Sequence, residues 1–334
     1  MSKRKITKHQ RRRIEARQAK YLSEAVDAAE ISNVEEKQGL VVAHHGKNLE
    51  IETSDGQQVV CRKRQHLGSL VPGDRVSWRP EKEGETGVVL ARMPRTTLLS
   101  RPNSRGQLHA VASNIDQVFV VIAPKPQPSQ TTVDRYLLAT EVASITPIVI
   151  LNKSDLLSAP ILSDPVFTFF QQYQNLGYTT LQICNKTGEG ITKLSALLQD
   201  KISVFVGQSG VGKSSIISSV LPEETIKVGK LSTLGEHGKH TTTTARLYHF
   251  SGQSGSLIDS PGIREFPLWP IEPRELANGF IEFRPFLGYC KFRNCLHQNE
   301  KGCALLEGLN QGKITADRLN SYQKLLVSMQ ENAS

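Results

Sequence analysis

Hydrophobic and polar residues alternate in five short runs in the N-terminal third of the chain. Turn residues such as Ser54-Asp55-Gly56 and Val71-Pro72-Gly73 separate these runs. The pattern predicts β-strands at residues 39–44, 49–53, 57–62, 74–79 and 86–93. Five short strands in succession predict a small barrel of the OB type, a fold that binds oligonucleotides and oligosaccharides. A generic five-stranded barrel without a ligand is an equally weighted alternative, although the barrel would have a basic rim of Arg62, Lys63, Arg64 and His66.

Nearly continuous apolar runs begin at Ile115, after a polar segment at 92–106 that predicts a linker. The apolar runs predict buried strands at 115–123, 146–151, 178–183 and 202–206. Helix-like segments lie between them, at 132–143, 165–176 and 191–198. This alternation predicts a three-layer α/β domain that binds its ligand at the carboxyl ends of the strands. Further helices are expected near 273–287 and 315–329.

The net charge of +9 is concentrated at the N-terminus. Residues 1–20 contain nine basic side chains and one acidic one, Glu15. We expect a basic arm that is disordered when free and that binds a polyphosphate surface, with a merely solubilising tail as the alternative. The arm lacks the hydrophobic segment of a signal peptide, and Ile6 and Ile14 scarcely form the apolar face of an organelle presequence.

The remaining composition excludes two classes of protein. Five unevenly placed cysteines argue against a secreted disulfide scaffold and suit a reducing compartment. The sequence contains no apolar run of roughly 18 residues, the length that predicts a transmembrane helix.

A phosphate-binding pattern, GxxxxGKS, follows the predicted strand at 202–206 and precedes a helix-like segment. This strand–loop–helix context is the one that a P-loop requires, and the alternative is a glycine-rich turn before a helix. Lys213 would contact the β- and γ-phosphates, and the Ser214 hydroxyl would bind Mg²⁺. The predicted nucleotide-binding residues here are Gly207, Gln208, Ser209, Gly210, Val211, Gly212, Lys213, Ser214 and Ser215.

A second motif, NKxD, follows the predicted strand at 146–151. The Asp155 carboxylate can accept hydrogen bonds from both N1–H and the 2-amino group of guanine, whereas adenine presents a different pattern. The predicted base-binding residues are Asn152, Lys153, Ser154 and Asp155, together with Cys184, Asn185 and Lys186 after the next strand. At that position we expect Cys184 to be a small packing residue rather than a reactive thiol.

Two further segments suit the switch regions of a GTPase. Asp259-Ser260-Pro261-Gly262 fits DxxG, in which Asp259 would hold Mg²⁺ through water and the Gly262 N–H would contact the γ-phosphate. The threonine-rich segment 235–245 would supply a hydroxyl to Mg²⁺, with Thr242 favoured over Thr241. A flexible threonine-rich loop without this role is the alternative.

Three cysteines and a histidine lie close together in the C-terminal region. Cys290, Cys295, His297 and Cys303 form a Cys₃His set, the donor set of a structural Zn²⁺ site with no open position for catalysis. Chance clustering is the weaker alternative. The chain therefore predicts a multidomain fold: an N-terminal OB-type β-barrel, a central circularly permuted α/β P-loop GTPase domain and a C-terminal helical zinc-binding domain. The expected divisions are 1–38 (basic tail and linker), 39–100 (barrel), 101–112 (linker), 113–272 (GTPase domain) and 273–334 (zinc domain).

The order of the motifs is unusual, because the guanine motif precedes the P-loop. With its basic arm, barrel, NKSD, GQSGVGKSS, GKHTTTT, DSPG and CxxxxCxHxxxxxC, the chain resembles the ribosome small-subunit-dependent GTPase A family. The resemblance implies a cytoplasmic GTPase that binds the small ribosomal subunit and its 16S rRNA late in maturation. GTP or GDP, Mg²⁺ and one structural Zn²⁺ are the implied cofactors. The pair Cys184-Asn185 departs from the Ser-Ala-like pair more usual there.

The residue after DxxG is Ile263, where Ras-type enzymes use a glutamine to orient water. We therefore expect slow intrinsic hydrolysis that the subunit accelerates, with His240 as the candidate catalytic group. The expected protein is a monomer without membrane contact, and other assembly factors are further candidate partners. One alternative is an RNA-binding assembly chaperone that uses GTP only as a conformational switch. Another, an ATP-dependent kinase or remodeller, is disfavoured by NKSD.

Overall fold

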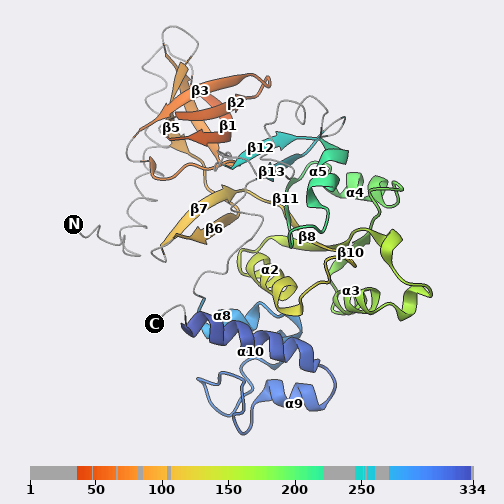
Figure 1. Ribbon diagram of the computed structural model, residues 1–334. Helices are drawn as coiled ribbons and strands as arrows, with labels where there is room; N and C mark the ends of the chain where they lie inside the picture. The colour runs from red at the N-terminus through yellow and green to blue at the C-terminus, as the bar shows by residue number, and fades with distance from the viewer. Residues whose placement is uncertain are drawn as a thin grey trace. The chain divides into compact units, whose positions relative to one another are not determined.

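The computed structural model describes residues 36–331 except 47, 65–66, 82–85, 104–106, 222–244, 251, 253 and 260–270. These residues form two compact units. The first contains 36–96, 112–114 and 245–247, and the second contains the rest (Figure 1). The basic arm, His66, His240, Thr241, Thr242, Gly262 and Ile263 lie outside the described residues.

The first unit is built on a closed five-stranded barrel (Figure 1). Strand β1 pairs with both β2 and β4, β2 pairs with β3, and β5 pairs with β3 and β4. The barrel therefore closes in the order 1-2-3-5-4, which confirms the expected OB-type barrel. Its strands are β1 (Lys37–His45), β2 (Asn48–Thr53), β3 (Gln58–Lys63), β4 (Arg75–Pro80) and β5 (Thr86–Arg92).

The barrel interior is filled by apolar side chains that alternate with outward-facing polar residues. Leu49 and Ile51 of β2 are fully buried there, and the Trp78 indole packs among them. A β-carbon at Gly87 would lie 2.6 Å from the Trp78 ring and 2.8 Å from Cys61 Sγ. Glycine at this position therefore lets β5 approach the tryptophan closely, which explains how so narrow a barrel holds so large a ring.

The segment expected to be a linker contains regular structure. Strands β6 (Leu98–Pro102) and β7 (Leu108–Ser113) pair as a separate two-stranded sheet. Asn103 and Gln107 close the turn between them, through a backbone bond of 2.9 Å and a side-chain bond of the same length. The divisions between domains remain a prediction, but residues 101–112 are more than an extended connection.

The second unit contains a parallel sheet in the order β10-β9-β8-β11-β13. The strand that leads to NKSD, β9, and the strand that leads to the P-loop, β11, therefore flank the same strand, β8. The strands are β8 (Gln117–Ile122), β9 (Thr146–Leu151), β10 (Thr179–Gln182), β11 (Ile202–Val206) and β13 (Ser256–Asp259). Strand β12 (Arg246–His249) begins in the first unit and ends in the second.

Helices pack on this sheet through apolar side chains. Phe119 of β8 stacks on Phe205 of β11 with ring centroids 4.8 Å apart, and leucines and isoleucines of α4 and α5 cover them. Alternate residues of β8 point to the opposite face and are equally buried. The α-helices here are α2 (Gln130–Val142), α3 (Pro165–Asn175), α4 (Ile191–Leu198) and α5 (Lys213–Val220), and the short helices are η2 (Ser154–Leu156) and η3 (Ile161–Ser163).

The C-terminal part of the second unit is helical. Its core is formed by Phe280, Phe283, Tyr322 and leucines of the surrounding helices, and Leu138 of α2 belongs to the same core. The elements are α8 (Pro273–Asn278), η4 (Ile281–Phe286), α9 (Ala304–Asn310) and α10 (Ala316–Glu331). None of the helices in the described part of the chain has the length and apolarity needed to cross a membrane.

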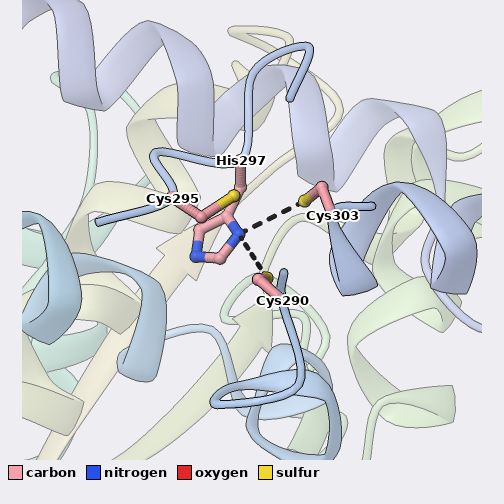
Figure 2. A group of neighbouring side chains, drawn as sticks. All are labelled: Cys290, Cys295, His297 and Cys303. Carbon is pink, nitrogen blue, oxygen red and sulfur yellow. Dashed lines mark hydrogen bonds between the residues drawn. The ribbon is translucent and has the colours of Figure 1, made fainter. Parts of the chain in front are cut away.

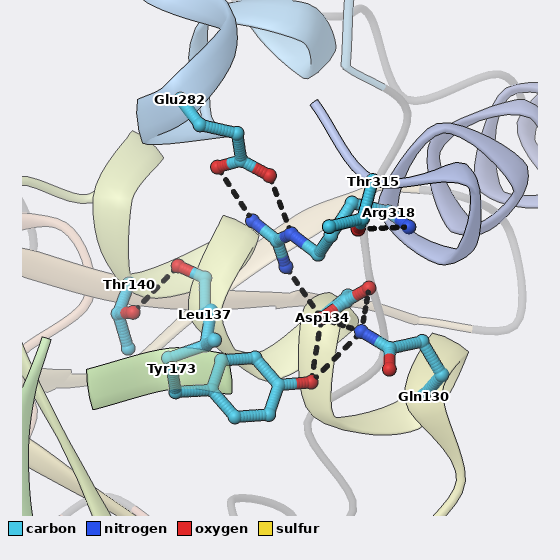
Figure 3. A network of polar contacts seen from close by, with 8 residues as sticks. All are labelled: Gln130, Asp134, Leu137, Thr140, Tyr173, Glu282, Thr315 and Arg318. Atoms are coloured by element: carbon cyan, nitrogen blue, oxygen red, sulfur yellow. Dashed lines mark hydrogen bonds and ion pairs between the residues drawn. The ribbon is translucent and has the colours of Figure 1, made fainter. Parts of the chain in front are cut away.

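A buried ion-pair network joins α10 to α2 (Figure 3). Arg318 of α10 donates to Asp134 of α2 at 2.5 Å and to both oxygens of Glu282 at 2.5 and 3.0 Å. Asp134 also accepts from the Tyr173 hydroxyl at 2.8 Å and from Gln130 Nε2 at 3.0 Å. The polar groups of the network thus satisfy one another, as buried charges require.

The guanidinium at the centre of this network also packs against an aromatic ring. Arg318 is 2 % exposed and its Cζ lies 4.5 Å from the Phe280 ring centroid. Burial alone would lower the pKa of Arg318, but Asp134 and Glu282 outweigh burial and raise its pKa. Arg318 therefore stays charged, and it fixes the C-terminal helices to the α/β sheet through α2.

Candidate functional site

The predicted nucleotide-binding loops all follow the carboxyl ends of parallel strands. Asn152 comes directly after β9, Gly207 after β11, and Cys184 shortly after β10. Because neighbouring parallel strands end at the same edge of a sheet, these loops gather there although they are distant in sequence.

The P-loop turns sharply between β11 and α5. Gly207 and Gly212 have φ angles of +145° and +97°, which residues with a side chain rarely adopt. A β-carbon at Gly207 would also lie 2.3 Å from the Val121 carbonyl oxygen. Lys213 begins α5, and its Nζ donates to the Gly207 and Gln208 carbonyls at 2.6 and 2.7 Å. The P-loop leads directly into the start of α5, where the first backbone N–H groups of a helix can bind an anion.

Direct contacts join the NKSD loop to the P-loop. Asn152, 1 % exposed, donates from Nδ2 to the Val211 carbonyl at 2.9 Å. A β-carbon at Gly212 would lie 2.3 Å from this same nitrogen, so the two loops touch without room for a side chain. Lys153 Nζ donates to the Gly210 carbonyl at 2.6 Å. These contacts fix the positions of the two loops relative to each other.

One pocket of about 380 Å³ is shared by the two loops. Asp155 lines it together with Gly212 and Ser215 at the start of α5. Two buried amide oxygens, Asn152 Oδ1 and Asn185 Oδ1, have no hydrogen-bond partner among the described residues. The sequence predicted eight of the residues that line this pocket as nucleotide-binding residues: Asn152, Lys153, Asp155, Cys184, Asn185, Lys186, Gly212 and Ser215. The ninth, Leu156, was not predicted.

Ser154 faces a neighbouring loop. It is 8 % exposed, and its hydroxyl donates to Glu189 Oε2 at 3.3 Å. Cys184 also makes a contact that the sequence did not indicate, because its Sγ lies 3.3 Å from Asp155 Oδ1. Glycines on both sides of Glu189 are the only sequence signal that this loop is tightly turned.

The predicted Mg²⁺ site is only partly described by the structure. Asp259 ends β13 and is 8 % exposed, and Ser214 lies in the first turn of α5. Strands β11 and β13 are parallel neighbours, so they end at the same edge of the sheet. Asp259 at the end of β13 and Ser214 in the helix after β11 therefore both belong to that edge. A hydroxyl and a carboxylate are hard oxygen donors of the kind that Mg²⁺ takes. Thr242 and Gly262 belong to the parts of the chain that the structure does not describe.

The C-terminal cysteines and His297 converge on one point (Figure 2). Their ligand atoms lie within 4.8 Å of one another, and His297 Nδ1 is 3.5 Å from Cys290 Sγ and 3.4 Å from Cys303 Sγ. Burial raises the pKa of Cys295 to about 12. Burial also lowers the pKa of His297, and this lower pKa favours the neutral imidazole that binds metal. Four converging sulfur and nitrogen donors fit a structural Zn²⁺ site.

The loop that carries these ligands is held by backbone hydrogen bonds. The Glu300 carboxylate accepts from the Leu296 and Gln298 N–H groups, both at 2.7 Å. Burial alone would raise the pKa of Glu300, but these N–H groups outweigh it and lower that pKa. The Ala304 N–H lies 3.3 Å from Cys290 Sγ, as expected where a thiolate is held by backbone donors. The ligand loop is thus shaped by the protein itself.

A parallel sheet with a P-loop, an NKSD motif that lines the same pocket and reversed motif order define a class, the circularly permuted P-loop GTPases. Residues 92–269 match the family described as RsgA GTPase. The chain belongs to this family.

Two relatives that share one name are similar to the chain over nearly its whole length. A protein of Pseudomonas fluorescens named small ribosomal subunit biogenesis GTPase RsgA is 47 % identical over 348 residues, covering 100 % of both chains. A protein of the same name from Azotobacter vinelandii is 46 % identical over 343 residues and covers 99 % of each.

Two solved structures have the same fold. YjeQ from Thermotoga maritima, at 30 % identity, matches with a TM-score of 0.72 over 89 % of this chain and 99 % of that one. YloQ, described as a circularly permuted GTPase, matches with a TM-score of 0.70 at 25 % identity, over 89 % and 96 % of the two chains.

Proposed function

We propose that this protein hydrolyses GTP to GDP and phosphate while it acts in the late maturation of the small ribosomal subunit. The subunit would stimulate hydrolysis, and the nucleotide state would control release of this protein or of other assembly factors. The observation that carries the proposal is the pocket shared by Asp155 and the start of α5. The names of the full-length relatives support the ribosomal partner.

The two ends of the nucleotide would be held by different loops. Asp155 would accept from N1–H and the 2-amino group of guanine, while Lys153 would cover the base and the Asn185 N–H would face O6. The N–H groups of the P-loop and Lys213 would hold the phosphates. The amide oxygens of Asn152 and Asn185, which have no partner in the part of the chain that the structure describes, support a ligand with hydrogen-bond donors at this end of the pocket.

Hydrolysis requires a water molecule aligned with the γ-phosphate. When bound, Mg²⁺ would neutralise phosphate charge, with Ser214, Thr242 and Asp259 as its protein ligands and Gly262 beside the γ-phosphate. Ile263 can neither donate nor accept through its side chain, so we assign the orientation of water to His240, ordered by the subunit. This assignment explains why the protein is expected to hydrolyse GTP slowly when no subunit is bound.

The other parts of the chain would make the contact with the subunit. The basic arm at 1–20 and the barrel are proposed to bind 16S rRNA through phosphate contacts. The zinc site would hold the C-terminal fold together, and no step of the reaction is assigned to it. We propose that the protein acts as a monomer in the cytoplasm. We also propose that its domains are divided as predicted, at 1–38, 39–100, 101–112, 113–272 and 273–334.

A GTPase assay with and without purified small subunits tests the proposal. We expect faster turnover with small subunits, no acceleration with large subunits, and no activity in Lys213→Ala. Turnover that is indifferent to small subunits would remove the partner. If a hydrolysis-deficient variant with GTP bound is still released normally from subunits, the chaperone that uses GTP only as a switch is the better description.

A further inference from the structure

The loop Cys184–Glu189 contacts the residue assigned to guanine recognition. Cys184 Sγ lies 3.3 Å from Asp155 Oδ1, and Lys186 Nζ lies 4.0 Å from Asp155 Oδ2. Each carboxylate oxygen thus faces a different donor from the same loop. The two donors differ in their surroundings, because Cys184 is 1 % exposed whereas the Lys186 side chain is 84 % exposed. The buried thiol is therefore the better fixed of the two.

The thiol is held in place by the backbone on both sides. Cys184 N donates to the Glu189 carbonyl at 3.0 Å, and Gly188 N donates to the Cys184 carbonyl at 2.9 Å. These bonds close the loop on itself. These bonds fix the main chain at Cys184, and the 1 % exposure of the residue leaves its side chain little room to turn away from Asp155.

The same loop also holds the turn that carries Asp155. The Ser154 hydroxyl donates to Glu189 Oε2 at 3.3 Å, and Ser154 N donates to the Ile183 carbonyl at 3.3 Å. Lys153 has a φ angle of +58°, so this turn adopts a backbone conformation that ordinary residues rarely take. Contacts from Ile183 to Glu189 thus stabilise a turn that the isolated chain would not favour.

We propose that Cys184 is a positioning residue for guanine specificity: its thiol donates to Asp155 Oδ1 and fixes the plane of the carboxylate that reads the base. This inference rests on the proposed function, because it concerns the base that the pocket binds. An ionised carboxylate oxygen has two lone pairs, so Oδ1 can accept from the thiol and from the base together. Without the thiol, the carboxylate turns about its last side-chain bond toward solvent and Lys186.

The effect of losing the thiol follows from its chemistry. A thiol is a weak donor, but its acceptor here is charged, so Cys184→Ala should lower GDP affinity by about tenfold. Xanthine carries an oxygen in place of the 2-amino group and gains less from an aligned carboxylate. XDP affinity should therefore change much less, and the preference for GDP over XDP should fall by about tenfold. Cys184→Ser supplies a stronger donor and should keep the preference.

The test is calorimetric titration of GDP and XDP into the full-length wild type, Cys184→Ala and Cys184→Ser. Cys61→Ala, which removes a buried thiol from the barrel, is the matched control and should leave the preference unchanged. Asp155→Ala and the double variant with Cys184→Ala complete a cycle. If the thiol acts through Asp155, Cys184→Ala has no further effect on GDP binding once Asp155 is gone.

Three outcomes decide the question separately. A lower preference in Cys184→Ala that serine restores and that disappears without Asp155 supports the inference. An unchanged preference in Cys184→Ala, or an equal loss with and without Asp155, overturns it while leaving the proposed function intact. A wild type that does not prefer GDP to XDP overturns the proposed function itself.

Discussion

Arg318→Met is expected to be the most informative change to the attachment of the C-terminal helices. It removes the guanidinium and keeps a long side chain that can still pack against Phe280. Asp134, 1 % exposed, then loses its cation, and its remaining donors among the described residues are the hydroxyl of Tyr173 and the amide of Gln130. The Glu282 side chain, 8 % exposed, loses both of its bonds to Arg318.

The magnitude follows from leaving buried carboxylates without a partner. Removing one member of a buried ion pair costs about 3–5 kcal/mol. For a unit of this size, that corresponds to a decrease in Tm of roughly 6–20 °C. Arg284→Met is the matched control, because Arg284 pairs with Glu141 at 2.6 Å but is 43 % exposed. Such a pair contributes about 0–1 kcal/mol.

Thermal unfolding of the zinc-loaded protein, followed by circular dichroism, measures the decrease in Tm of each variant. A decrease in Tm of Arg318→Met that is no larger than that of Arg284→Met would refute the role given to the network.

Other changes test the nucleotide site, the metal site and the barrel. Asp155→Asn should exchange GTP for XTP as the preferred substrate in competition assays, and retained GTP preference would contradict the base assignment. Lys213→Ala should abolish hydrolysis by loss of phosphate contacts, as measured by phosphate release. Cys303→Ser should reduce bound zinc below one ion per chain by elemental analysis and increase amide exchange in α10, whereas full zinc content would contradict its role as a ligand. Burial lowers the pKa of His44, so the barrel should be less stable below the ordinary value of 6.5 than above it, because the unfolded state then binds more protons. In urea titrations His44→Gln should weaken that dependence, and an unchanged pH profile would argue against it.

Most of the fold could be predicted because its hydrophobic patterns are unambiguous. Residues 146–151, 191–198 and 202–206 form the predicted strand, helix and strand with the same bounds. Turn residues between the alternating runs likewise locate all five barrel strands. Among the missed elements, β6 and β7 are short, with Pro102 at the end of β6 and a turn after it, and α9 is a seven-residue helix directly after Cys303.

The site was predictable where its chemistry is carried by consecutive residues. The P-loop and NKSD belong to short motifs, and the sheet brings them to one edge. The Cys184–Asp155 and Ser154–Glu189 contacts were not predicted, because each joins two loops and depends on how a short turn closes. The same limit applies to Arg318, whose partners Asp134 and Glu282 lie on two different elements and share no motif.

The order of strands in the sheet has a consequence for how the domain is made. Of the five parallel strands, β8 is synthesised first, and it lies in the middle of the sheet that they form. As the chain emerges, β9 can add to one edge of β8 and β10 to β9, then β11 to the other edge of β8 and β13 to β11. None of these five strands has to insert between two that were made earlier. The sheet can therefore grow outward during translation, and the half that carries NKSD is complete before the half that carries the P-loop has been synthesised.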